Sequence, residues 1–248
     1  MEKVIYIAEL DADIDDIIAV EYLHKQNVLD TLVLDPIPKD AEGRKRLEIL
    51  RKKGIKVSDT IPEGAKIIFI GGGLTAVAKY ISNHSGIETL VMNGGFAGSN
   101  IVPFKNQLAK FRNKTFIRTF NFNIDVKSTD IVLRSSVEQI RNIILVGKNV
   151  CHSDRNTKLG LWKNGIARKI LDEYHVKDDK KQHDMLACHE GLALTSLIDE
   201  EPICVYQTVY PRTENGLEGN MTKWGSANKQ DGTPYRAVQS AVGFRGEK

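Results

Sequence analysis

The chain has 248 residues and a formal net charge of +3, which suits one large α/β domain with a substantial core over residues 1–248. Charges of both signs are mixed and no apolar run reaches the length of a membrane span, so we expect neither nucleic acid nor a membrane as partner. The three cysteines lack metal-like spacing and no export signal is apparent, which predicts reduced, buried thiols and a cytoplasmic protein.

Strands and helices alternate along the first two thirds of the chain. Short runs of branched apolar residues predict buried strands, and the segments between them favour helices. The predicted strands are residues 4–7, 31–34, 66–70, 88–92 and 142–146, and the predicted helices are residues 15–26, 41–53, 74–82 and 184–197. Residues 115–124 alternate like a further strand. This order predicts an α/β fold with a mainly parallel, Rossmann-like open sheet, helices on both faces and short β elements from about Cys204.

Five carboxylates crowd into the eight residues from Glu9 to Asp16. They lie where the first predicted strand ends and the first predicted helix begins, and open α/β sheets bind their ligands at that edge. One or two acids suffice to cap a helix, whereas so many like charges repel one another unless a cation lies among them. The cluster therefore predicts a metal site or a catalytic site.

Five ordered segments, beginning with the acidic run E-L-D-A-D-I-D-D, are shared in pattern with a known family. The later segments are Gly72-Gly73-Leu74-Thr75-Ala76, Val91-Met92-Asn93-Gly94-Gly95, Asn121-Phe122-Asn123 and His183-Asp184-Met185-Leu186-Ala187. They resemble the D-x-D-P-G-x-D-D, G-P-L-T-N, V-M-G-G, E-F-N and H-D-P-L-A of the nucleoside hydrolases, the calcium-dependent N-ribohydrolases. The resemblance covers roughly three quarters of the chain and implies a nucleoside-hydrolase-like fold.

The resemblance implies hydrolysis of the N-glycosidic bond of a nucleoside or related riboside. Asp11 would act as general base on a metal-activated water, and His183 would give a proton to the departing base. Ca2+ would be held by Asp11, Asp16, Asp184 and the backbone carbonyl of Thr75. The residues expected to bind the riboside are Asp15, Met92, Asn100, Asn121 and Asn123. The family also implies a homo-oligomer, either a dimer or a tetramer.

Departures from the family pattern affect the substrate half of this expected site. Ala12-Asp13 replaces Pro-Gly in the first loop, and Asn121 replaces a glutamate. A neutral amide in place of a carboxylate would tolerate a negatively charged 5′ substituent, which Lys114 or Arg118 could then pair with.

Other interpretations of the same residues stay open. Asp11-Ala12-Asp13 also resembles the D-x-D of haloacid-dehalogenase-type phosphatases, which use magnesium. The chain could instead be a nucleoside-binding homologue without turnover. Individual residues have structural interpretations too: Asp184 could cap its helix, and Asn121 and Asn123 could bond to neighbouring backbone.

Overall fold

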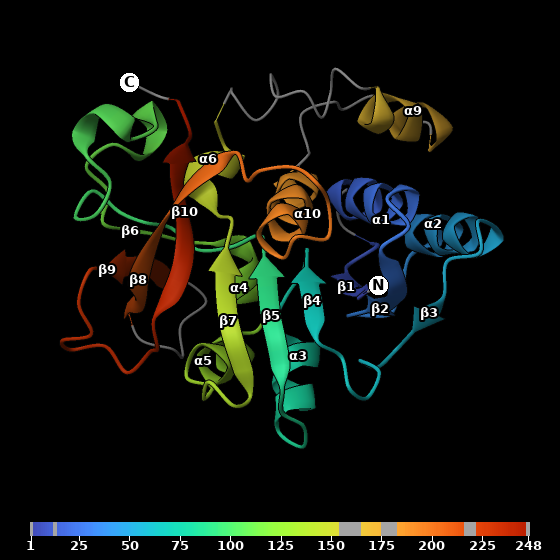
Figure 1. Ribbon diagram of the computed structural model, residues 1–248, viewed down its shortest axis with the longest axis horizontal. Coiled ribbons are helices and arrows are strands. Elements are labelled where there is room, and N and C mark those ends of the chain that lie inside the picture. The colour runs from blue at the N-terminus through green and yellow to red at the C-terminus, as the bar shows by residue number, and fades with distance from the viewer. Residues whose placement is uncertain (1, 12–13, 154–164, 175–182, 216–221, 247–248) are drawn as a thin grey trace.

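The computed structural model describes residues 2–11, 14–153, 165–174, 183–215 and 222–246. It is an α/β fold on one 10-stranded, mainly parallel mixed sheet (Figure 1). The strands are β1 (Val4–Ala8), β2 (Leu29–Leu34), β3 (Val57–Ser58), β4 (Ile67–Ile70), β5 (Ile87–Met92), β6 (Phe116–Ile117), β7 (Ile140–Leu145), β8 (Cys204–Glu214), β9 (Lys223–Ala227) and β10 (Val238–Phe244).

The helices include α1 (Asp15–Lys25), α2 (Ala41–Lys52), α3 (Thr75–Ile81), α4 (Phe120–Ile124), α5 (Val126–Leu133), α6 (Lys148–Cys151), α9 (Ile166–Glu173) and α10 (His183–Leu194). Two short 3-10 helices, η1 (Phe104–Asn106) and η2 (Ala109–Phe111), lie in the connection that precedes β6. Among the residues that the structure describes, no helix combines the length and apolar character needed to cross a bilayer.

The strand order places a topological switch at β1. The order across the sheet is β3-β2-β1-β4-β5-β7-β10-β8-β9-β6. From β1 the chain builds β2 and β3 on one side and then returns to build β4 on the other side, with parallel pairing throughout. Ligands of open α/β sheets bind outside the carboxyl ends of the strands at such a switch. The strand order alone therefore predicts that a ligand binds at the segments that follow β1 and β4.

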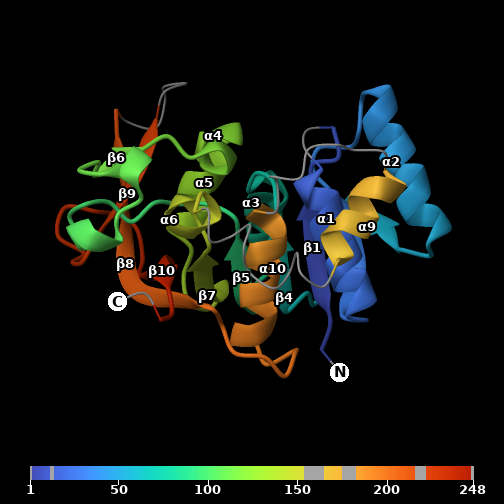
Figure 2. The ribbon, with the colours of Figure 1, turned by 90° about the horizontal axis from the view of Figure 1, so that it is seen from above.

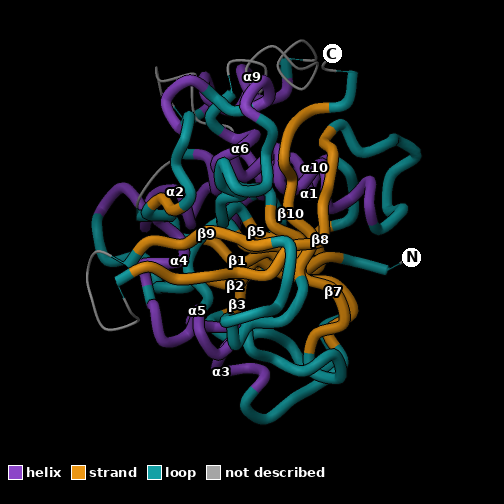
Figure 3. Tube along the Cα trace, turned by 90° about the vertical axis from the view of Figure 1, so that its left-hand side faces the viewer, coloured by secondary structure: helices purple, strands orange, loops and turns teal. Residues whose placement is uncertain are grey.

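Helices cover both faces of the sheet (Figure 3). They do so because the side chains of the central strands are apolar on both faces, and each face needs a covering layer. In β1, Val4 and Tyr6 join the core beneath α1 and α10, whereas Ile5 and Ile7 join the core beneath α3 and α5. Helices α1 and α10 contact each other although they are far apart in the sequence (Figure 2). That contact brings an early segment and a late segment to the same edge of the sheet.

Most of the predicted elements are confirmed within a few residues, and the three cysteines are free and buried as expected. The prediction of a strand over residues 115–124 is wrong for most of its length. Only Phe116–Ile117 is strand, and Phe120–Ile124 forms α4. The β elements predicted after Cys204 are present, and β8 and β10 extend the main sheet.

Candidate metal and substrate site

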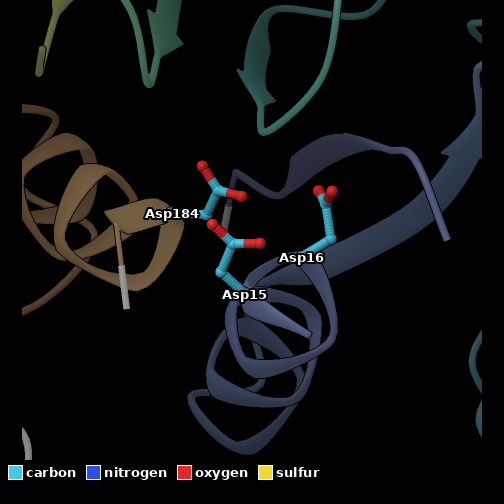
Figure 4. A group of neighbouring side chains, drawn as sticks. All are labelled: Asp15, Asp16 and Asp184. Carbon is cyan, nitrogen blue, oxygen red and sulfur yellow. The ribbon is translucent and has the colours of Figure 1, made fainter. Parts of the chain in front are cut away.

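Three carboxylates meet at the carboxyl edge of the sheet. Asp15 and Asp16 open α1, and Asp184 is the second residue of α10. One oxygen of each lies within 4.8 Å of the other two (Figure 4). The three residues are only 8%, 3% and 2% exposed, respectively. The packing of α1 against α10 thus concentrates negative charge in a poorly solvated place.

Asp16 is held by the strand behind it. The Tyr6 hydroxyl donates a hydrogen bond to Asp16 Oδ1 at 2.9 Å, and the Glu9 amide donates to Oδ2 at 3.3 Å. Burial and the nearby charge of Asp15 nonetheless raise the pKa of the Asp16 carboxyl well above its ordinary value. A cation among the three acids would favour the ionised form and oppose that shift.

Asp184 is positioned by the loop that follows β5. The Asn93 side-chain amide donates to Asp184 Oδ1 at 2.7 Å. Asn121 fixes this loop, because its amide donates to the carbonyls of Asn93 at 2.8 Å and Gly71 at 2.6 Å. Asn121 therefore joins the ends of β4 and β5 from α4.

Gly71 leaves the space that the acids occupy. A Cβ at this position would lie 2.7 Å from Asp184 Oδ2 and closer still to Asp16 Oδ1 and the Tyr6 hydroxyl. Real Cβ atoms do not approach other atoms so closely, so any side chain here must displace the carboxylates.

The acids form part of a pocket of about 200 Å³. This volume is below the roughly 300–1,000 Å³ of drug-sized sites, so the pocket suits a ligand group about the size of a monosaccharide. Its remaining walls come from the loops after β1, β4, β5 and β7, from α4 and from the start of α10. The other lining residues are Glu9, Gly71, Asn93, Gly94, Gly95, Thr119, Phe120, Asn121, Lys148, Cys151, His152 and His183.

Two histidines form one side of the pocket. The rings of His152 and His183 lie 4.9 Å apart between centroids, and Phe111 meets His152 edge-on. Burial, together with the positive charges of Lys148, His183 and Lys110, lowers the pKa of His152 to about 3. His152 is therefore neutral at physiological pH.

The structure brings together five of the residues predicted for the site: Asp15, Asp16, Asn121, His183 and Asp184. It does not bring Asp11 to them. The Asp11 carboxylate accepts hydrogen bonds from the amides of Lys39 at 2.8 Å and Asp40 at 3.4 Å, just before α2. These donors compete for the negative charge of Asp11 and direct the side chain away from the other acids. Ala12 and Asp13, which replace Pro-Gly, lie outside the described residues.

Four further predicted residues lie outside the pocket lining. Thr75 is exposed and its hydroxyl donates to Asp125 at 3.3 Å, and Met92 is fully buried in the core. Asn100 donates to the Ser226 carbonyl, and Asn123 donates to the Thr119 carbonyl. Asn123 diverges from Asn121 because residues two apart share one side of a strand but point about 200° apart on a helix. The bond of Asn123 to local backbone matches the structural interpretation of that residue.

Several lining residues were not predicted from the sequence to belong to the site. Asn93 and the Lys148–His152 segment follow β5 and β7, so their position after predicted parallel strands was a usable signal. Tyr6 carried no such signal, since a tyrosine inside an apolar strand is typical of a core residue.

The donor set of the three aspartates fits a hard divalent cation. Calcium binds oxygens at 2.3–2.6 Å, so two oxygens on one ion can be at most about 5 Å apart. The spacing of no more than 4.8 Å meets that limit. Three carboxylates leave coordination positions for water or for ligand hydroxyls.

No family model matches the chain. A protein of Aquifex aeolicus (strain VF5), described as an uncharacterized protein, is 29% identical over 169 residues, which is 63% of this chain. The chain matches 56% of the length of that relative.

Proposed function

We propose that the protein is an N-glycosyl hydrolase of the nucleoside hydrolase type, which cleaves the N-glycosidic bond of a nucleoside or related riboside with Ca2+ as cofactor. The observation that carries the proposal is the convergence of Asp15, Asp16 and Asp184 on one point inside a pocket of about 200 Å³. The resemblance of the five sequence segments supports the proposal. Asp15 and Asp16 belong to the first segment, and Asp184 belongs to the last.

The cation would be held by Asp16 and Asp184, with Asp15 as the third acid. When bound, it would orient sugar hydroxyls and make a water more acidic. Asn93 keeps Asp184 directed at this point through its 2.7 Å hydrogen bond, and Tyr6 does the same for Asp16 at 2.9 Å. The negative charge of the acids would stabilise an oxocarbenium-like sugar in the transition state.

Proton transfer needs a base near the attacking water and an acid near the departing group. Asp15 is the most exposed of the three acids, at 8%, and lines the pocket, so we assign it the role of general base. The family resemblance assigns that role to Asp11, whose carboxylate instead faces the backbone before α2. His183 also lines the pocket, beside the ring of His152, where it could give a proton to the leaving base.

The two alternative functions differ in what they require of this site. A phosphatase of the haloacid-dehalogenase type would need the Asp11 carboxylate in the pocket as nucleophile, and Asp11 is not among the lining residues. A binding protein without turnover would need only the ion and the pocket. Activity measurements therefore separate the second alternative from the proposal.

The first experiment is calcium titration by calorimetry. Asp16→Ala and Asp184→Ala should each abolish tight calcium binding, because the remaining carboxylates would lose a ligand of the same ion. Asp172→Ala is the control, since Asp172 is exposed on α9 and pairs with Arg168 within that helix. Unchanged affinity in either pocket variant contradicts the metal site.

The second experiment measures release of ribose from a panel of nucleosides and their 5′-monophosphates. Asp15→Asn should lower kcat by roughly 100- to 10,000-fold, as expected for loss of a general base, while Asp11→Asn should stay within about threefold of the wild type. The reverse result would return the role of base to Asp11. A wild-type protein that binds calcium and releases ribose from no substrate would favour the binding-protein alternative.

A further inference from the structure

Lys148 is a cation built into the same pocket as the three acids. It is the first residue of α6, directly after the Gly147 that follows β7, and its backbone amide donates to the Gly95 carbonyl at 3.1 Å. Gly147 packs so tightly on the Gly94-Gly95 backbone that an added Cβ would overlap both carbonyl oxygens. The backbone of Lys148 is thereby fixed at the pocket wall, and its side chain is half-buried there.

The ammonium of Lys148 has no acidic counterpart in the described ranges of the chain. Its closest polar contact there is His152 Nε2, at 3.3 Å, and no described carboxylate lies within 4.0 Å of Nζ. Burial and the neighbouring Lys110 lower the pKa of Lys148, and the nearby Cys151 thiol opposes that shift. Burying a positive charge without an anion is costly, so an anion from a ligand would relieve that cost.

The pocket is therefore lined by charges of both signs, three carboxylates and one ammonium that lies more than 4.0 Å from every described carboxylate. Charges of both signs act on Cys151, another lining residue: those of Asp184 and Asp15 raise the pKa of its buried thiol, and that of Lys148 lowers it. His152, being neutral, adds no positive charge of its own beside Lys148. Beyond His152, Phe111 meets its ring edge-on, and Lys110 lies 5.0 Å from the centre of the Phe111 ring. A ligand that matches this arrangement has hydroxyls for the carboxylates and an anion for the ammonium.

We propose that Lys148 binds the phosphate of a phosphorylated riboside whose sugar hydroxyls lie at the three carboxylates of the pocket. This inference rests on the proposed function for the placement of the sugar. Phosphate is favoured over a carboxylate because a second ammonium, Lys110, is close enough for its charge to lower the pKa of Lys148, although Lys110 itself is exposed and lies outside the pocket lining. Two ammonium groups match a group that carries close to two negative charges. Lys114 and Arg118, which the sequence had suggested for this role, are also exposed and outside the pocket lining, and unlike Lys110 they are not among the charges that shift the pKa of Lys148.

Calorimetry with ribose and ribose 5-phosphate in the presence of calcium tests the assignment. The wild-type protein should bind ribose 5-phosphate roughly 10- to 100-fold more tightly than ribose, as expected for a charge-assisted contact. Lys148→Met should lose most of this preference while its affinity for ribose stays within about threefold. Lys148→Arg should keep the preference, and so should Lys114→Met, which removes an exposed lysine outside the pocket.

A wild-type protein that binds the two sugars equally overturns the proposal, as does a Lys148→Met variant that retains the full preference. If Lys148→Met fails to fold, Lys148→Gln replaces it, with circular dichroism as the check and the same criterion. The measurement is independent of turnover. A protein that hydrolyses nucleosides but shows no preference for the phosphate keeps the proposed function and loses this inference. A protein that prefers ribose 5-phosphate but cleaves no riboside keeps this inference and loses the proposed function.

Discussion

Gly71→Ala tests the geometry of the site with a single methyl group. The new Cβ would lie 2.7 Å from Asp184 Oδ2 and even closer to Asp16 Oδ1 and the Tyr6 hydroxyl, whereas ordinary contacts begin at about 3.4 Å. Asp16 is 3% exposed and bonded to Tyr6, so it cannot move without breaking that 2.9 Å hydrogen bond. Overpacking of this kind typically costs about 1–3 kcal/mol.

The adjacent glycine supplies a matched control. A Cβ on Gly72 would make only ordinary contacts of 3.6 Å, with the Asp35 carbonyl and Glu9 Cβ. At about 2–4 °C per kcal/mol for a protein of this size, Gly71→Ala should melt roughly 2–12 °C below Gly72→Ala in metal-free buffer. Its calcium affinity, measured by calorimetry, should also fall at least about tenfold. Equal melting temperatures and equal calcium affinities in the two variants would refute the placement of Gly71 against the acids.

Three further outcomes follow from the same contacts. Because the Tyr6 hydroxyl lowers the pKa of Asp16, Tyr6→Phe should raise that pKa further and move the onset of calcium binding, titrated from pH 5 to 9, to higher pH. In metal-free protein the pKa of Asp16 is higher in the folded state than in the unfolded state, so Asp16 contributes stability at low pH that is lost as the pH rises through its pKa in the folded state. Asp16→Asn should therefore flatten the dependence of the unfolding free energy on pH. Phe120 lines the pocket with 63% of its surface exposed, so Phe120→Ala should raise KM for a nucleoside through the loss of about 1–3 kcal/mol of stacking. Phe104 is 58% exposed but lies outside the pocket lining, so Phe104→Ala should leave KM unchanged.

The sequence predicted the parts of the molecule that depend on local pattern. Runs of branched apolar residues correctly predicted β1, β4 and β5. The acids of α1 and α10 were noticed because they lie at the first turn of helices that the sequence also predicts. Strand order explains why these acids meet, and the alternation of strands and helices already implied a parallel sheet. The assignment of Asp15, Asp16 and Asp184 to one site depended on the resemblance as well as on this pattern.

The predictions that differ from the structure concern segments whose conformation is decided by tertiary contacts. Residues 115–124 alternate in polarity, yet residues 120–124 form α4. There Phe122 is buried in the core and its carbonyl accepts from the Thr129 hydroxyl, while Asn123 donates to the carbonyl of Thr119, the residue before the helix. Asp11 is drawn to the backbone before α2 by donors that are 28 and 29 positions away in the sequence. No local pattern contains such partners, so the direction of the Asp11 side chain could not be read from the sequence.

The meeting of α1 and α10 has a consequence for the motions of the metal-free protein. Docking α10 places Asp184 against Asp15 and Asp16, so like-charge repulsion opposes the docked position of α10 at this edge of the sheet. A segment held less firmly opens more often, and its amide protons exchange faster with solvent than those of the central strands. Any cation that binds all three carboxylates binds only the docked state, and it therefore slows that exchange by mass action. The protection of the α10 amides against hydrogen exchange would then report the concentration of the ion, even in a variant that has lost all turnover.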